Sequence, residues 1–188
     1  MKSLIIIAAF CVIGIGCTPK TKTTTPGANT YTTKTGKVIS IVEEHPVGMS
    51  LSTVKIGFDN DSLAPIVLTD IDPVNKVILG DLDSNGYDEV YIISTAAGSG
   101  SYGSIHGFAS NNDKSLSAVS IPGIEKSDLA KGGQFEGYEG HDEFFLDVNT
   151  LTRTFPVKLA DGNKRTIIYT LKKGEASFQL YIASSTVN

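Results

Sequence analysis

The stretch EFFLDVNTLTRTFPV, residues 143–157, decides the fold of this chain. It lies in a region, from Gly36 onward, in which hydrophobic residues recur with a period of two and β-branched and aromatic residues are frequent. Residues 143–148 and 151–157 are therefore expected to be strands, and Asn149-Thr150 between them is expected to form a tight turn. The stretch predicts a β-hairpin.

The same pattern extends to both sides of this hairpin. Only residues 124–131 have a composition that suits a helical turn. The predicted fold is all-β, an antiparallel β-sandwich or, as the alternative, a barrel. The further strands are expected at residues 37–42, 53–58, 77–79, 90–93, 104–109, 165–171 and 178–182.

Length and composition limit the class of protein. With 188 residues, of which 40% are hydrophobic, the chain is long enough for one domain with tails. It has no apolar run of the ~18 residues that a transmembrane helix needs. Its net charge of −4 argues against a nucleic-acid partner, which requires a basic surface.

The N-terminus predicts export. Residues 1–16 combine a basic start at Lys2 with an apolar run over residues 4–15, as signal peptides do. The small residues before Cys17 resemble the lipobox of bacterial lipoproteins, in which that cysteine is lipidated. A lipid anchor on Cys17 would make the membrane a partner and would place the protein in the periplasm or at the outer membrane or cell surface. The alternative is an ordinary secretory peptide.

The chain beyond the signal divides into two parts. Residues 17–36 are rich in Thr and have no large aliphatic side chain, so they are expected to form a flexible tether. Residues 37–188 are the expected folded domain, which contains no cysteine and therefore no disulfide. This domain has 12 basic and all 20 acidic residues, a net charge of −8. Such a charge suits a basic soluble partner, or serves solubility alone.

The segment DLDSNGYDE, residues 81–89, has oxygen-bearing side chains at alternate positions and Gly at the sixth. This spacing lets a loop curl around a hard cation such as Ca²⁺. The candidate ligands are Asp81, Asp83, Asn85 and Glu89. The alternative is a metal-free loop in which Asp and Asn side chains accept hydrogen bonds from backbone N–H groups.

The segment GSGSYG, residues 98–103, satisfies the dinucleotide-binding pattern, but the residues after it have the period of a strand, whereas that site needs a helix. Its glycines instead suit a slim loop that displays Ser99, Ser101 and Tyr102 and can enter a narrow cleft. The alternative is a plain hairpin connection.

The sequence has no recognisable catalytic motif. His45, His106 and His141 are scattered without metal-ligand spacing, and no Gly-x-Ser-x-Gly elbow is present. We therefore expect no enzymatic activity, no catalytic residue and no required cofactor.

Several blocks together resemble the periplasmic inhibitors of invertebrate-type lysozyme. The similarity covers roughly residues 75–182, and the Ser-Gly-Ser-Tyr loop is its most specific element. The blocks are residues 80–91, 97–103, 140–144, 153–157 and 165–169.

The resemblance implies an exported β-sandwich that protects bacterial peptidoglycan by blocking a lysozyme, and a homodimer is common in that family. It implies that Ser99 and Tyr102, with Gly100 and Ser101 between them, enter the cleft of the enzyme. The competing hypothesis is a Ca²⁺-binding adhesion or carbohydrate-binding surface lipoprotein built around the Asp81 loop.

Overall fold

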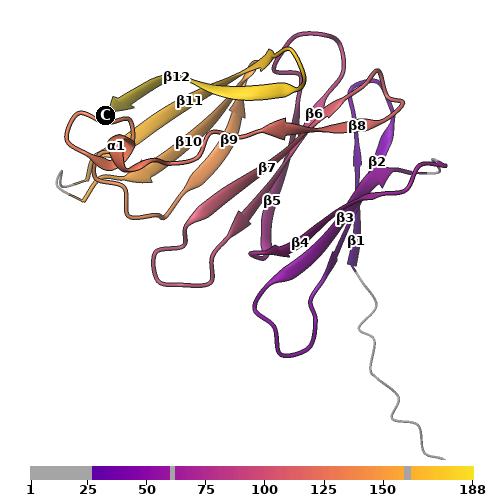
Figure 1. The fold of residues 1–188 in the computed structure, drawn as a ribbon, viewed down its shortest axis with the longest axis horizontal. Helices are drawn as coiled ribbons and strands as arrows, with labels where there is room; N and C mark the ends of the chain where they lie inside the picture. Colours follow the sequence, from indigo (N-terminus) through magenta and orange to yellow (C-terminus); the bar gives the residue numbers. More distant parts are fainter. Residues whose placement is uncertain (1–26, 60–61, 159–161) are drawn as a thin grey trace, which may run out of the picture.

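The computed structural model describes residues 27–188 apart from 60–61 and 159–161. Four strands form the smaller of two sheets, in the order β1-β2-β3-β4, and each neighbouring pair is antiparallel (Figure 1). Their bounds are Gly27–Thr32 (β1), Val38–Glu44 (β2), Ser52–Phe58 (β3) and Ile66–Ile71 (β4).

The larger sheet has eight strands in the order β5-β6-β7-β8-β12-β11-β10-β9. All neighbours are antiparallel except β8 and β12, which run parallel. A single helical turn, α1 (Lys126–Leu129), lies within the segment expected to form one. The strands are Val74–Gly80 (β5), Glu89–Thr95 (β6), Gly103–Ser110 (β7), Leu116–Ser120 (β8), Glu143–Asp147 (β9), Thr150–Pro156 (β10), Lys164–Lys173 (β11) and Phe178–Val187 (β12).

The larger sheet curls until its two edge strands approach each other. Lys76 Nζ on β5 donates a hydrogen bond to the Phe144 carbonyl oxygen on β9, at 2.8 Å. Leu146 of β9 packs so closely on Gly80 of β5 that a Cβ at Gly80 would lie 2.6 Å from its methyl groups. The result is a nearly closed barrel filled with apolar side chains from all eight strands. The all-β prediction is confirmed, and both alternatives are present, since the smaller sheet packs on the outside of this barrel.

Strand β6 belongs to both hydrophobic cores. Tyr91 and Ile93 face the interior of the barrel, whereas Val90 and Ile92 face the smaller sheet. All four are at most 2% exposed. A strand buried on both faces needs apolar residues at successive positions, which explains the unbroken apolar run. Each such side chain contributes about 1.5–3 kcal/mol to folding.

The predicted tether spans residues 17–36, but its C-terminal part belongs to the folded domain. Residues 27–32 form strand β1, which pairs with β2 over its full length. Tyr31 packs against the core between the sheets, and Thr33 is buried. One aromatic anchor and a backbone ladder thus order a segment whose Thr-rich composition suggested a flexible chain. The predicted signal peptide, Cys17 and the rest of the predicted tether lie outside the described residues.

Strands β4 and β8 were not predicted. Only Val119 among their residues is fully buried, so neither segment needs the strict alternation that identifies a strand. The β9–β10 turn also lies one residue earlier than predicted. Thr150 pairs with Asp147, and the turn residues are Val148 and Asn149, with Val148 at φ 49°. Within the described ranges, no helix is long and apolar enough to cross a membrane.

Candidate functional site

The two candidate loops lie at opposite ends of strand β6 (Figure 1). Residues 81–88 connect β5 to β6, and residues 96–102 connect β6 to β7. Seven strand residues separate them, which is roughly 20 Å at the usual rise. They are therefore separate sites.

The Ser-Gly-Ser-Tyr loop is closed by its own backbone. The N–H of Ala96 donates to the Tyr102 carbonyl oxygen at 2.9 Å, and the N–H of Ser101 donates to that of Gly98 at 2.9 Å. Ser101 has the left-handed backbone conformation, φ 43°. These bonds give the loop one defined conformation.

A second segment holds the loop from outside. The N–H of His141 donates to the Gly100 carbonyl oxygen at 2.7 Å. Gly140 has φ 87°, and a Cβ there would lie 1.9 Å from the same oxygen. Only glycine permits this approach.

A buried polar network lies beneath the loop. Asp142 Oδ2 accepts hydrogen bonds from the Gly103 N–H at 2.7 Å and from the Tyr138 hydroxyl at 2.6 Å. Its other oxygen pairs with Arg153 Nε at 2.6 Å, and the side chains of Asp142 and Arg153 are 0% and 6% exposed. Arg153 also donates to the Gly103 carbonyl oxygen at 3.3 Å and to the Tyr138 hydroxyl. The end of the loop is thus bonded to a buried ion pair.

Aromatic rings enclose the guanidinium group of Arg153. Its Cζ lies 5.2 Å, 4.8 Å and 5.3 Å from the ring centres of Phe135, Tyr138 and Phe144. Burial disfavours the charged form of Arg153, but the hydrogen bond and charge of Asp142 outweigh it, so the pKa of Arg153 is raised. The group stays cationic in an apolar shell because its hydrogen bonds are satisfied.

The loop presents free hydroxyl groups to solvent. Ser99 is exposed and Tyr102 is 48% exposed. Within the described part of the chain, neither hydroxyl has a hydrogen-bond partner. The Tyr102 ring is oriented from below by an edge contact with Tyr138, at 5.6 Å between ring centres.

The three glycines of the loop have different roles. A Cβ at Gly100 would lie 2.4 Å from Cε2 of Tyr102, and one at Gly103 would lie 2.6 Å from the Phe144 ring. A Cβ at Gly98 would meet nothing within 4 Å. Contacts within the chain therefore exclude a Cβ at Gly100 and Gly103, whereas Gly98 faces open solvent.

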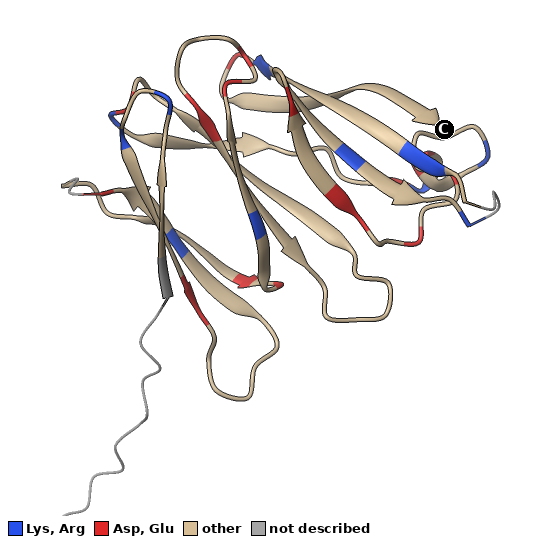
Figure 2. Ribbon diagram, turned by 180° about the vertical axis from the view of Figure 1, so that it is seen from behind, with Lys and Arg blue, Asp and Glu red and all other residues tan. Residues whose placement is uncertain are grey.

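A hollow of about 430 Å³ lies beside the loop and is lined by Ser99, Tyr102 and His141. The exposed ion pair of Lys158 with Glu139 also lines it. The loop itself has no charged residue, and the β6–β7 connection is tan, without red or blue, in the charge view (Figure 2). An acidic cleft would therefore meet no like charge from the loop.

The Asp81 loop uses its side chains as caps. Asp81 accepts hydrogen bonds from the N–H groups of Asn85 and Gly86 at 2.9 Å and 3.0 Å, and Asp83 accepts one from Asn85 at 3.1 Å. The Asn85 side-chain oxygen accepts from the Tyr87 N–H at 2.8 Å. This is the predicted turn chemistry, and it leaves carboxylate oxygens with further capacity.

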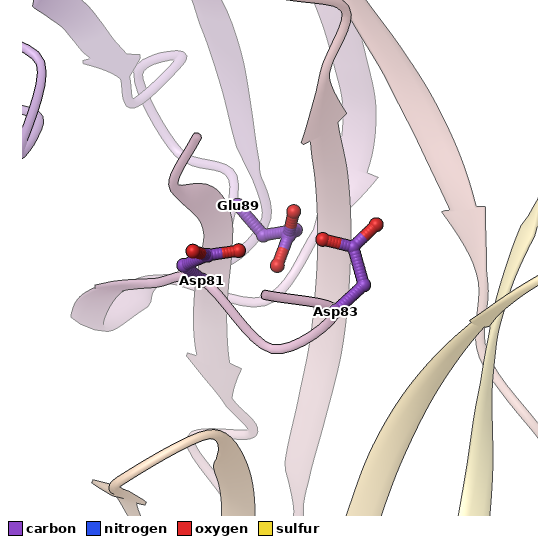
Figure 3. A group of neighbouring side chains, drawn as sticks. All are labelled: Asp81, Asp83 and Glu89. Atoms are coloured by element: carbon purple, nitrogen blue, oxygen red, sulfur yellow. The ribbon is translucent and has the colours of Figure 1, made fainter. Parts of the chain in front are cut away.

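Glu89 is the first residue of β6 and has no exposed surface. Its side chain lies beside those of Asp81 and Asp83 from the loop (Figure 3). Its Oε2 accepts a hydrogen bond from the Leu82 N–H at 2.7 Å, whereas Oε1 is buried and has no partner among the described residues. Burial raises the pKa of Glu89 to about 8. Burial also acts to raise the pKa of Asp81, but hydrogen bonds from Lys34, Gly86 and Asn85 lower it overall.

The histidines do not form a cluster. His141 lies beside the loop. The His45 ring is hydrogen-bonded to the Ser52 hydroxyl, and the His106 ring is hydrogen-bonded to the Ser94 hydroxyl. The sequence indicated the loop and the acidic segment, but not the supporting roles of Arg153, Tyr138 and Phe135. The sequence feature that could have indicated this network is Arg153, a charged residue in a strand whose other residues are apolar or Thr.

The chain matches no known protein-family model, no curated protein and no solved structure.

Proposed function

We propose that this chain inhibits invertebrate-type lysozyme by inserting residues 99–102 into the active-site cleft of the enzyme. One observation carries the proposal: the exposed loop is fixed by segments distant in sequence, and these segments belong to the blocks of the resemblance. His141 and Asp142 bond the loop at Gly100 and Gly103. Arg153 then holds Asp142. These blocks of the resemblance thus share one physical role, which is to hold the loop in place.

A fixed loop suits an inhibitor. A lysozyme cleaves its substrate with two carboxyl groups placed in a cleft. The Ser99 and Tyr102 hydroxyls, which have no hydrogen-bond partner among the described residues, are donors for such groups. A hydrogen bond to a charged group is worth roughly 1.5–3 kcal/mol. Because the loop is already ordered, little conformational entropy is lost on binding.

Charge supports the encounter with the enzyme. Residues 37–188 have a net charge of −8, whereas the loop has none. The overall field attracts a basic enzyme and raises the association rate, and the loop avoids repulsion inside an acidic cleft.

The test is peptidoglycan hydrolysis by an invertebrate-type lysozyme in the presence of the full chain, kept soluble by a mild detergent. Chicken-type and goose-type lysozymes serve as comparators. We expect inhibition of the invertebrate type and a loss of at least a hundredfold in potency for the Ser99→Ala/Tyr102→Ala double variant. A double variant that inhibits as well as wild type would exclude the loop, and a wild-type chain that inhibits no lysozyme would exclude the function.

A second candidate is cation-dependent carbohydrate binding at the other end of β6. A polar hollow of about 460 Å³ there is lined by Asp83 and Asn85 and by the β7–β8 and β11–β12 turns. Its amide, hydroxyl and charged groups suit sugar hydroxyls, and Phe178 offers an apolar face. Retention on immobilised peptidoglycan that is abolished by a chelator would favour this function over inhibition.

A further inference from the structure

The buried carboxylate of Glu89 lacks one of the partners that burial requires. Its Oε1 is shielded from solvent and accepts no hydrogen bond from the described residues. Leaving a polar atom buried without a partner costs about 1–3 kcal/mol, and more for a charged group. In folded proteins a water molecule or an ion is a common partner of such an atom.

The surroundings of this carboxylate indicate which partner it takes. Figure 3 shows the Glu89 carboxylate between those of Asp81 and Asp83. One oxygen of each residue lies within 4.8 Å of the other two. Two oxygens bound to one Ca²⁺ at the usual distances are at most about 5 Å apart, so a single ion can contact all three groups.

From these observations we propose that Asp81, Asp83 and Glu89 bind a divalent cation of the Ca²⁺ class at the end of the barrel. The donor set consists only of oxygens, which suits Ca²⁺ rather than Zn²⁺. The loop supplies ligands from turn residues and from the first residue of β6, so binding would fasten the β5–β6 connection to the barrel.

The ammonium group of Lys34 does not take the place of this cation. Lys34 forms an ion pair with Asp81, and its side chain is 46% exposed. In the described part of the chain it makes no hydrogen bond to Asp83 or Glu89. Lys34 neutralises one carboxylate at the rim and leaves Oε1 of the buried Glu89 without a partner among the described residues. It should therefore compete weakly with the cation.

The test is calorimetric titration of the full chain with CaCl₂, and separately with MgCl₂, after treatment with a chelator. We expect one Ca²⁺ site, weaker binding of Mg²⁺, and a higher melting temperature with Ca²⁺ by circular dichroism. Glu89→Gln, which keeps the shape of the side chain, should weaken Ca²⁺ binding at least tenfold. Lys34→Gln should strengthen it severalfold.

Two further variants keep the result interpretable. Asp83→Asn changes a partly exposed loop residue and should weaken Ca²⁺ binding even if Glu89→Gln disturbs folding. Glu44→Gln removes an exposed carboxylate paired with Lys55 in the smaller sheet and should bind Ca²⁺ like wild type. The proposal is overturned if millimolar Ca²⁺ produces neither heat nor a melting shift, or if Asp83→Asn binds Ca²⁺ as wild type does.

Discussion

The backbone N–H of His141 donates a hydrogen bond to the carbonyl oxygen of Gly100, at 2.7 Å. This single bond joins the segment before β9 to the tip of the β6–β7 loop, across 41 positions of sequence. The bond depends on the absence of a side chain at Gly140, because a Cβ there would lie only 1.9 Å from the Gly100 oxygen.

Gly140→Ala should therefore distort the loop, and Gly98→Ala should not. The alanine at position 140 must adopt a positive φ, at a cost of about 1–2 kcal/mol, and must also push the Gly100 carbonyl away. Gly98 faces open space, so its alanine variant should stay within about 0.5 kcal/mol of wild type. Urea unfolding and the lysozyme assay measure both effects. Equal behaviour of the two variants would contradict the supporting role of Gly140.

Asp142→Asn should destabilise the protein far more than Glu143→Gln, although the residues are adjacent. The first variant leaves the buried Arg153 without its counter-charge, which typically costs about 3–5 kcal/mol. The second removes an exposed pair with Lys164, worth at most about 1 kcal/mol. The measurement is the free energy of unfolding in urea. A small loss for Asp142→Asn would mean that the aromatic shell, and not the ion pair, supports Arg153.

The sequence allowed the fold to be predicted where burial is one-sided or complete. Residues 52–58 alternate between buried and half-buried, and residues 90–93 are buried on both faces, so their patterns were informative. Strand β1 has little apolar area and is ordered through its ladder with β2. Pairing with a distant strand leaves no local signature, and for this reason β1 was assigned to the tether.

In the candidate site, too, local features could be predicted from the sequence and long-range contacts could not. The loop at residues 98–103 is local and could be recognised from its glycines. The network that fixes it joins Asp142 to Arg153 and both to Gly103, 39 and 50 positions away. Glu89 directly precedes an apolar run, yet the sequence does not reveal that its carboxylate turns inward. Both features depend on tertiary contacts.

Val148→Asn should stabilise the β9–β10 hairpin. Val148 has φ 49°, a conformation that a β-branched residue adopts only under strain and that Asn tolerates. Its side chain is 83% exposed, so little burial is lost. We expect a gain of about 1 kcal/mol in the free energy of unfolding. Val47→Asn is the matched control, since Val47 is 88% exposed without a positive φ. A gain of the same size at Val47 would show that replacing an exposed apolar side chain by a polar one, and not the relief of backbone strain, is responsible.

The contribution of His106 to stability should fall as the pH decreases from 7.5 to 5.5, whereas that of Glu89, whose pKa burial raises to about 8, should rise over the same range. Burial lowers the pKa of His106, and the charge of Asp72 offsets this only in part. The unfolded chain then binds a proton near pH 6.5 while the folded chain does so only at lower pH, so folding is opposed between these values. His106→Gln should remove the His106 contribution, so that, relative to wild type, the variant is more stable at pH 5.5 than at pH 7.5. Thermal melts across the range measure the slope, and an unchanged slope in His106→Gln would assign the effect to other groups.

Tyr102→Ala should reduce inhibition of lysozyme more than Ser99→Ala does. The Tyr102 variant removes a hydroxyl and a ring that is already oriented by Tyr138, and truncation of such an anchor costs about 2 kcal/mol or more. Ser99→Ala removes one hydrogen bond, worth about 1–2 kcal/mol. Tyr102→Phe, which keeps the ring, should lie between wild type and Tyr102→Ala in inhibition and so separates the two contributions.

All three variants should melt close to wild type because the loop lies outside both cores. If Tyr102→Phe loses as much inhibition as Tyr102→Ala, the hydroxyl alone carries the contact. If Ser99→Ala proves the more damaging variant, the tyrosine is not the anchor of the loop.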